Sequence, residues 1–512
     1  MSKVFQKVGG LRPGRSAFDL SYEQKLTCDM GQLIPIMCDE VVPGDYFKIG
    51  NEIVIRFQPM LAPIMHQVDV FVHYFYVPYR LLWDDWEEFI TRGADGDQAL
   101  TIPTAFPAGG INPGDLWDYL GMPTGVVLPA DNKPMLFPVN AYNMIWNEYY
   151  RDQNLQNERS LTDASSVARR AWMKDYFTSA LPWTQRGTAP ALPISGTTSA
   201  VFGSDIETKY NFVGQLENYE VSSDNQGVMT FNRIGTPGTF TPGSGNSIEI
   251  DNADLNTNTV DLSVASTFDI NDLRQAWQIQ KWMERNARAG VRYTEFLKAH
   301  FGVAPSDSRL DRPEYIGGNR APVIVSEVLQ TSSTDATTPQ GNMAGHGLAV
   351  NRSYVASYKV QEYGLIMGIM SVMPKPAYQQ GIDRQWLRKT AFDFYFPEFA
   401  HLGEQPIQTM ELYATNSKET NETIFGYQQR FAEMRHKRSQ VHGLLRSDLD
   451  FWHLGRIFDS PPGLNSDFIT CNPDKRIFAV PSEPGLIVSF GNKIKAIRPL
   501  PVISEPGLVD HF

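Results

Sequence analysis

The chain has 512 residues and a mass of 57.6 kDa, enough for about three domains of ordinary size or one large, elaborated domain. Its 40 glycines and 34 prolines stay well below the ~25–30% of residues that is typical of disordered chains. With 45 basic and 57 acidic residues the net charge is −12, which excludes a nucleic-acid-binding surface that covers the whole chain. Any such contact must be local.

The three cysteines and the apolar segments narrow the class of protein further. Cys28, Cys38 and Cys471 form no CxxC pair, which excludes a disulfide framework and a four-cysteine zinc site and favours a reducing compartment. The first fifteen residues contain no apolar stretch of a secretory signal. The most continuous apolar run, residues 364–373, has the length of a buried strand, not of a membrane helix. We therefore expect no membrane span and a protein that stays inside the cell that makes it.

Period-two alternation predicts that most of the regular structure is β. Residues 47–82 read as two strands and a turn, with Ile53 and Ile55 on one face and Val54 and Arg56 on the other. Residues 68–77 are apolar on both faces, as in a strand that is covered on each side. Further strands are predicted at residues 323–329, 355–372, 390–396, 476–480 and 486–490.

Two helices are predicted between the strands. Apolar residues at three-and-four spacing predict one helix over residues 139–149. Another begins at Asn271, carries Leu273, Trp277 and Met283 on one face, and ends at Gly290. Strands at both ends of the chain with helices only in the connections favour a sandwich or jelly roll over a βαβ succession.

Residues 190–270 differ in composition from the rest, being rich in Gly, Ser, Thr, Asn and Pro. They hold ten acidic residues against Lys209 and Arg233, a net −8 of the chain's −12. An acidic disordered linker is one interpretation. Short alternating runs that contain aromatics favour a folded surface insertion. Its candidate apolar contacts are Phe202, Tyr210, Phe212, Val213, Tyr219, Val228, Phe231 and Phe240.

Basic residues gather at two other places. The N-terminal arm carries Lys3, Lys7, Arg12 and Arg15 without an acid. The second group is Arg430, Arg435, Lys437, Arg438 and Arg446, with Phe431 and Trp452 near it in sequence. Basic and aromatic side chains together can bind phosphates and stack bases of a single strand. The alternative is a subunit contact that pairs with acids elsewhere.

Motifs for catalysis are absent from the sequence. There is no GxxxxGK[ST], GxGxxG, HExxH or GxSxG pattern, and the spacing of His436, His442 and His453 matches no zinc site. We therefore expect no enzyme, cofactor or metal. Asp84, Asp85, Glu87 and Glu88 beside two tryptophans have the composition of a sugar cleft. A carbohydrate-binding or carbohydrate-cleaving β protein is thus the alternative, although such a cluster is more often a solvated helix face.

Several segments resemble the major capsid proteins of the gokushovirus group of microviruses, which are small bacteriophages with single-stranded DNA. The resemblance covers nearly the whole chain except residues 190–270. It is carried by NDLRQAWQIQKWMERNARAGVRYTEFLKAHFGV (271–303), AYNMIWNEYYRDQNLQ (141–156), RLDRPEYIGGNR (309–320), FDFYFPEFAHLGEQPI (392–407), LDFWHLGRIF (449–458) and IRPLPVISEPGL (497–508).

The resemblance implies an eight-stranded antiparallel jelly roll of the viral capsid type with long helix- and loop-containing insertions. It implies assembly into a T=1 icosahedral shell around a circular single-stranded DNA genome. The implied partners are further copies of the chain, an internal scaffolding protein, a DNA pilot protein, a small basic DNA-packing protein and a host-cell surface receptor. The implied locations are the virion and, during assembly, the host cytoplasm.

Together these interpretations predict four regions. They are a basic arm over residues 1–40, jelly-roll strands with insertions over 41–189, the acidic surface insertion over 190–270, and the remaining strands, helical insertion and C-terminal segment over 271–512. We expect the insertion to protrude outward and to take part in host attachment, because its negative charge would oppose packaged phosphate. We expect the basic residues to face the genome.

Overall fold

The computed structural model describes residues 14–93, 99–190, 210–213, 219–223, 229–233, 247–250, 270–290, 292–329 and 343–503. It divides into a larger unit, residues 1–186 with 284–512, and a smaller unit, residues 187–283. Lys3, Lys7, Arg12, Phe202, Val228 and Phe240 lie outside the described residues.

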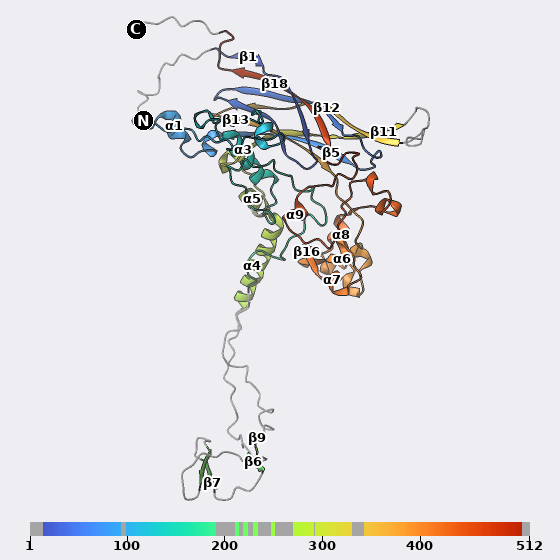
Figure 1. Cartoon of the computed structure of the whole chain (residues 1–512). Helices are drawn as coiled ribbons and strands as arrows, with labels where there is room; N and C mark the ends of the chain where they lie inside the picture. Colours follow the sequence, from blue (N-terminus) through green and yellow to red (C-terminus); the bar gives the residue numbers. More distant parts are fainter. Residues whose placement is uncertain are drawn as a thin grey trace. The chain divides into compact units, whose positions relative to one another are not determined.

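The larger unit is built on two antiparallel sheets (Figure 1). In the six-stranded sheet, β18 (Leu486–Arg498) pairs on one side with β1 (Ser16–Asp19) and β2 (Tyr22–Cys28) and on the other with β4 (Tyr46–Phe57), which is followed by β12 (Met343–Lys359) and β11 (Ile324–Leu329). The four-stranded sheet has the order β10 (Glu314–Pro322), β5 (Val68–Pro78), β13 (Gly364–Pro374) and β3 (Ile34–Val41). The protein is therefore mainly β.

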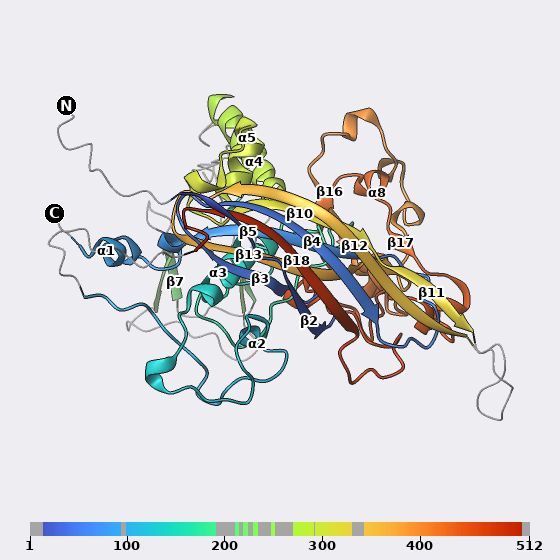
Figure 2. The same cartoon turned by 90° about the horizontal axis from the view of Figure 1, so that it is seen from above.

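Alternation along the strands explains the core between the sheets. In β4, Phe47, Ile49, Ile53 and Ile55 are buried while the side chains between them on the opposite face are half-buried or exposed. The buried set packs in one cluster with residues of β18 and of the inner face of the second sheet. The six-stranded sheet thus buries one face only, and Figure 2 shows its other face without a covering layer.

The four-stranded sheet is covered on both faces, as predicted for residues 68–77. Every residue of β13 is buried, and β5 is buried at all but two positions. A second core lies on its outer face, where Phe75, Val77 and Met367 pack against α3 (Phe137–Ile145). That helix begins two residues before the predicted one and continues as a π-helical turn, η4 (Trp146–Tyr150).

The remaining helices of the larger unit are short and lie in the connections. They are α1 (Trp86–Thr91), α2 (Leu116–Tyr119), α5 (Tyr293–Phe301), α6 (Thr409–Leu412), α7 (Lys418–Glu422), α8 (Ala432–Arg435) and α9 (Ser466–Ile469). Small strand pairs occur between β15 (Glu404–Gln408) and β16 (Ile424–Gln429) and between β14 (Ala377–Tyr378) and β17 (Ser439–Gln440). No helix in the described ranges has the length and apolar character that crossing a membrane requires.

Two predicted strands are wrong and one is divided. Residues 390–396 contain the 3-10 helix η9 (Ala391–Asp393), because the Asp393 carboxylate accepts hydrogen bonds from the backbone amides of Lys389 (2.9 Å) and Thr390 (2.8 Å). Residues 476–480 form only an isolated bridge between Phe478 and Met60. The predicted strand 355–372 is the end of β12 and most of β13, with a turn between them.

In the smaller unit, the described part of the acidic insertion contains two antiparallel pairs. β6 (Tyr210–Val213) pairs with β9 (Ser247–Ile250), and β7 (Tyr219–Ser223) pairs with β8 (Met229–Arg233). Helix α4 (Ile270–Ala289) follows, as the sequence predicts. On its predicted apolar face Leu273 and Trp277 are exposed.

Candidate interaction surfaces

Within the described ranges, exposed apolar side chains cluster at residues 386–402, here called the aromatic segment. Trp386 and Phe392 are 74% and 70% exposed, and Phe394, Tyr395, Phe396 and Leu402 are also exposed. The 3-10 helices η8 (Arg384–Trp386), η9 and η10 (Pro397–Phe399) shape this segment. Exposed apolar clusters of this kind are typical of protein–protein contacts.

Arginines hold the aromatic segment from beneath. The Arg388 guanidinium lies 5.4 Å from the Phe394 ring centre and 3.1 Å from the carboxylate of the buried Glu433. Arg430 donates to the Phe392 carbonyl at 2.9 Å and lies over Phe431. Burial opposes ionisation of Glu433, but hydrogen bonds from Gln405 and Arg388 outweigh it and keep its pKa below the ordinary value. These contacts hold the backbone at Phe392 and the ring of Phe394 in the segment.

A buried ionic cluster lies beside the aromatic segment. Glu411, on α6, accepts from Arg384 at 2.6 Å and from the Tyr176 hydroxyl at 2.8 Å. Arg438 donates to the backbone carbonyls of Glu411 and Gly381, the latter at 3.1 Å, and burial lowers its pKa. Arg438, a predicted phosphate contact, is thus used within the fold.

The other predicted phosphate contacts differ in their exposure to solvent. Arg430 is half-buried and bonded as described above. Arg435 and Lys437 are exposed, and Arg435 donates to Gln429 at 2.6 Å. Arg446 is exposed and donates to the Val441 carbonyl at 2.7 Å. Of the four basic candidates Lys3, Lys7, Arg12 and Arg15, the structure describes Arg15, which is exposed.

The predicted apolar contacts of the insertion lie partly on described strands. Tyr210, Phe212 and Val213 are on β6, Tyr219 is on β7 and Phe231 is on β8. The structure gives the backbone pairing of these positions and not the surroundings of their side chains, so their role in contacts stays a prediction.

The acidic cluster near α1 does not form a cleft. Asp84, Asp85, Glu87 and Glu88 are all exposed. The neighbouring Trp86 is buried, with its ring 4.8 Å from Tyr79 and 5.9 Å from Phe137. A sugar would need the indole rings on the surface beside the carboxylates. The cluster is a solvated helix face, which disfavours the carbohydrate alternative.

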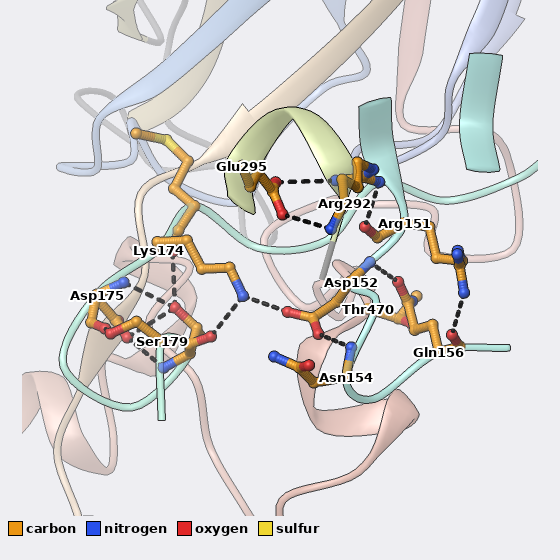
Figure 3. Close-up of polar contacts among 12 residues, drawn as sticks. Arg151, Asp152, Asn154, Gln156, Lys174, Asp175, Ser179, Arg292, Glu295 and Thr470 are labelled. Atoms are coloured by element: carbon orange, nitrogen blue, oxygen red, sulfur yellow. Dashed lines mark hydrogen bonds and ion pairs between the residues drawn. The ribbon is translucent and has the colours of Figure 1, made fainter. Parts of the chain in front are cut away.

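The NEYYRDQNLQ motif (residues 147–156) follows α3 and forms a network of hydrogen bonds and ion pairs, here called the polar bracket. The sequence did not predict this structural role. Figure 3 shows Lys174 reaching the Asp152 carboxylate, while Asp152 also accepts from the Asn154 amide at 3.0 Å. Gln156 bonds the Asp152 amide at 2.8 Å and the Thr470 hydroxyl at 2.9 Å.

The N-terminus of α5 joins the same bracket. Arg292 donates to the carbonyl of Arg151 at 3.3 Å and pairs with Glu295 at 3.4 Å (Figure 3). Segments that are far apart in the chain are thereby locked together by hydrogen bonds and ion pairs. The motif's charged residues therefore hold separate parts of the fold together.

The sequence was compared with protein families and with curated proteins. The matches are to capsid proteins, whose exposed surfaces contact other subunits. The family model described as capsid protein (F protein) matches residues 7–508. The chain belongs to this capsid protein family. It is 35% identical to capsid protein VP1 of Chlamydia phage 1, over 99% of this chain and 98% of the relative. Capsid protein VP1 of Bdellovibrio phage phiMH2K is 34% identical, with the same coverage, and that of Spiroplasma virus 4 is 32% identical over 96% of this chain and 95% of the relative.

A more distant relative matches over a shorter part of the chain. Capsid protein F of Escherichia phage alpha3 is 29% identical over 27% of this chain and 30% of the relative. The nearly full-length matches are to phages of the gokushovirus type. As a capsid protein, the chain has a structural role, and the resemblance found in its sequence is confirmed.

Proposed function

We propose that the chain is the subunit of a T=1 icosahedral shell that encloses a circular single-stranded DNA genome and that it is not an enzyme. The observation that carries this proposal is the family match over residues 7–508, which includes the sandwich and its insertions. The exposed aromatic segment supports it, because a structural subunit needs surfaces that are complete only in the assembly.

The strand order supports an eight-stranded jelly roll. Among the strands of the two large sheets, β3 lies in the smaller sheet, β4 in the larger, β5 and β10 in the smaller, β11 and β12 in the larger, β13 in the smaller and β18 in the larger. Two interlocked Greek keys give this kind of order. With β1 and β2 counted as one broken strand, and with β11 set aside as an edge strand that pairs antiparallel with β12, each sheet has four strands and the count is eight. The long insertions then fall between β5 and β10 and between β13 and β18.

The aromatic segment is proposed as a subunit contact. Rings that point to solvent cost solvation free energy, and burying them against a neighbour recovers it. Around symmetry axes such contacts are heterologous, so one patch meets a different patch on the next copy. Arg435 and Lys437 are exposed, and an exposed cation can meet either phosphate or an acidic neighbour.

The further partners follow from the resemblance. We propose an internal scaffolding protein during assembly in the host cytoplasm, and a DNA pilot protein and a small basic DNA-packing protein in the virion. The insertion, residues 190–270, is proposed to face outward and to contact a host-cell surface receptor. Its net charge of −8 favours a position away from packaged phosphate.

The assembly proposal is tested by sedimentation. Purified protein, alone and after co-expression with the scaffolding protein of its own phage, is analysed by velocity ultracentrifugation. The proposal expects large closed species in at least the second sample. A monomer under every condition would overturn it.

A further inference from the structure

The solvent face of the six-stranded sheet is strongly basic in a chain that is acidic overall. Side chains of alternate residues in β1, β2, β4, β12 and β18 lie on this face. Its charged members are seven basic residues, Lys25, Lys48, Arg56, Arg352, Lys359, Lys493 and Lys495, and three acidic ones, Asp19, Glu23 and Glu52. The excess of cations has the sign that phosphate requires.

Two of these lysines are direct cross-strand neighbours. Lys48 on β4 pairs with Lys495 on β18, and like charges in opposed positions destabilise a sheet. Asp19 lies on the other side of Lys495, but its carboxylate already accepts the backbone amide of Ser21 at 3.0 Å and the Ser21 hydroxyl at 2.5 Å. Hydrogen bonds from Ser21 and the nearby Lys495 and Lys493 lower the pKa of the Asp19 carboxyl, so this carboxylate offsets part of the repulsion between Lys48 and Lys495.

Most cations of this face lack an anionic partner among the described residues. Lys493 lies 3.5 Å from Glu52. Within the described part of the chain, the other six form no ion pair. By contrast, Arg384 and Arg388 are bound to Glu411 and Glu433. Unpaired surface cations are free to exchange their counterions for the phosphates of a nucleic acid.

The face also offers places for bases. Tyr354 is 64% exposed and lies across Gly50 from Lys493, so an aromatic ring stands among the cations. At the end of the face, a hollow of about 840 Å³ is lined by Lys25, Arg56, Ile487 and Tyr119, together with the acidic Asp29 and Asp118. Aromatic and apolar surfaces beside cations suit stacking by bases without sequence preference.

We propose that this sheet face binds the phosphate backbone of single-stranded DNA and is the genome-facing surface of the subunit. The inference rests on the proposed function. The N-terminal arm, with its four basic residues, leads directly into β1 on the same sheet. Figure 1 shows residues 404–435 on the opposite side of the sandwich. A shell has one inner surface, so Arg435 and Lys437 then do not face the genome.

The test compares the removal of four cations from the sheet face with the removal of two exposed cations elsewhere on the subunit. In the face variant, Lys25, Lys48, Arg352 and Lys495 are replaced by Gln. In the control, Arg435→Gln and Lys437→Gln remove exposed cations on the other side. Binding of mixed-sequence and oligo-dT single strands to purified protein is measured against salt concentration. Thermal unfolding checks that each variant is folded, and particle DNA content is measured for shells that form.

We expect the face variant to bind single-stranded DNA more weakly than the parent protein, and its affinity to depend less on salt concentration. The slope of log K against log salt should fall by about 0.7 for each phosphate that the variant no longer neutralises, or about 3 in all. Its affinity should drop equally for both DNA sequences, and the control should bind as the parent does.

Other outcomes would overturn the inference. Unchanged binding by the folded face variant, or weaker binding in the control alone, contradicts it directly. If the face variant binds DNA normally but its shells fail to close, the face is a protein contact and the inference is wrong. Failure of the parent chain to form shells would instead count against the proposed function.

Discussion

The Arg384 guanidinium lies 2.6 Å from the carboxylate of Glu411, a side chain that is only 1% exposed. Tyr176 donates to the other carboxylate oxygen at 2.8 Å. Burial raises the pKa of Glu411, and Arg384 is the strongest influence that opposes the rise. The buried, ionised Glu411 carboxylate is therefore stabilised by Arg384, and this stabilisation is lost if the arginine is removed.

Replacing Arg384 by Gln should destabilise the subunit by about 3–5 kcal/mol, because it leaves a buried carboxylate without a cation. The free energy of urea unfolding at neutral pH measures this. A carboxyl whose folded pKa is raised stabilises the fold at low pH and loses that contribution as pH rises through the folded pKa. The deficit of the variant should therefore shrink in acid. Lys418→Gln, which breaks an exposed pair, is the control and should change stability by less than about 1 kcal/mol.

Histidine protonation should weaken the subunit in mild acid. Burial lowers the pKa of His73 to about 4, with nearby Arg170 adding to the effect, and its ring stacks on Tyr150. The unfolded chain takes up this proton near pH 6.5, so the free energy of unfolding should fall as pH drops from about 6.5 to 4. His73→Gln should flatten that part of the pH profile. If the free energy of unfolding of the variant falls with pH as steeply as that of the parent, groups other than His73 cause the loss of stability.

Truncating the aromatic segment should separate folding from assembly. Trp386→Ala and Phe392→Ala remove exposed rings, so the free energy of unfolding should change by no more than about 0.5 kcal/mol. Shell yield, measured by sedimentation, should fall strongly. Met65→Ala, which removes an 80% exposed side chain outside the segment, is the matched control. Normal yield from the double variant would exclude the segment from the subunit contacts.

Deleting residues 214–261 and bridging the gap with a short Gly/Ser linker should leave particle yield intact and abolish adsorption to host cells. The reason is that the insertion lies in a compact unit distinct from the sandwich. Particle yield and adsorption are measured together. Normal adsorption would contradict the attachment role, and failed assembly would assign the segment to shell architecture.

Alternation predicted β4, β5 and β13 because their buried and exposed faces differ clearly or are both apolar. The same signal failed at residues 390–396, where aromatic side chains alternate on an exposed surface and local hydrogen bonds to Asp393 fix the turns. Edge strands such as β1 and β2 were missed because few of their residues are buried.

The candidate surfaces could also be predicted only in part from the sequence. Charge runs in the sequence identified residues 430–446, yet Arg438 is held inside the fold, because Gly381 and Glu411 become its neighbours only in the folded chain. The basic sheet face was not found, since Lys48 and Lys495 come together only through strand pairing. Lysines two apart in a strand, Lys493 and Lys495, were the one local signal for it.

Electron microscopy of the purified protein, co-expressed with its scaffolding protein, tests the central claim most directly. The capsid assignment predicts uniform closed particles with icosahedral symmetry and one subunit per asymmetric unit. Preparations of folded protein that contain only monomers or irregular aggregates would contradict it.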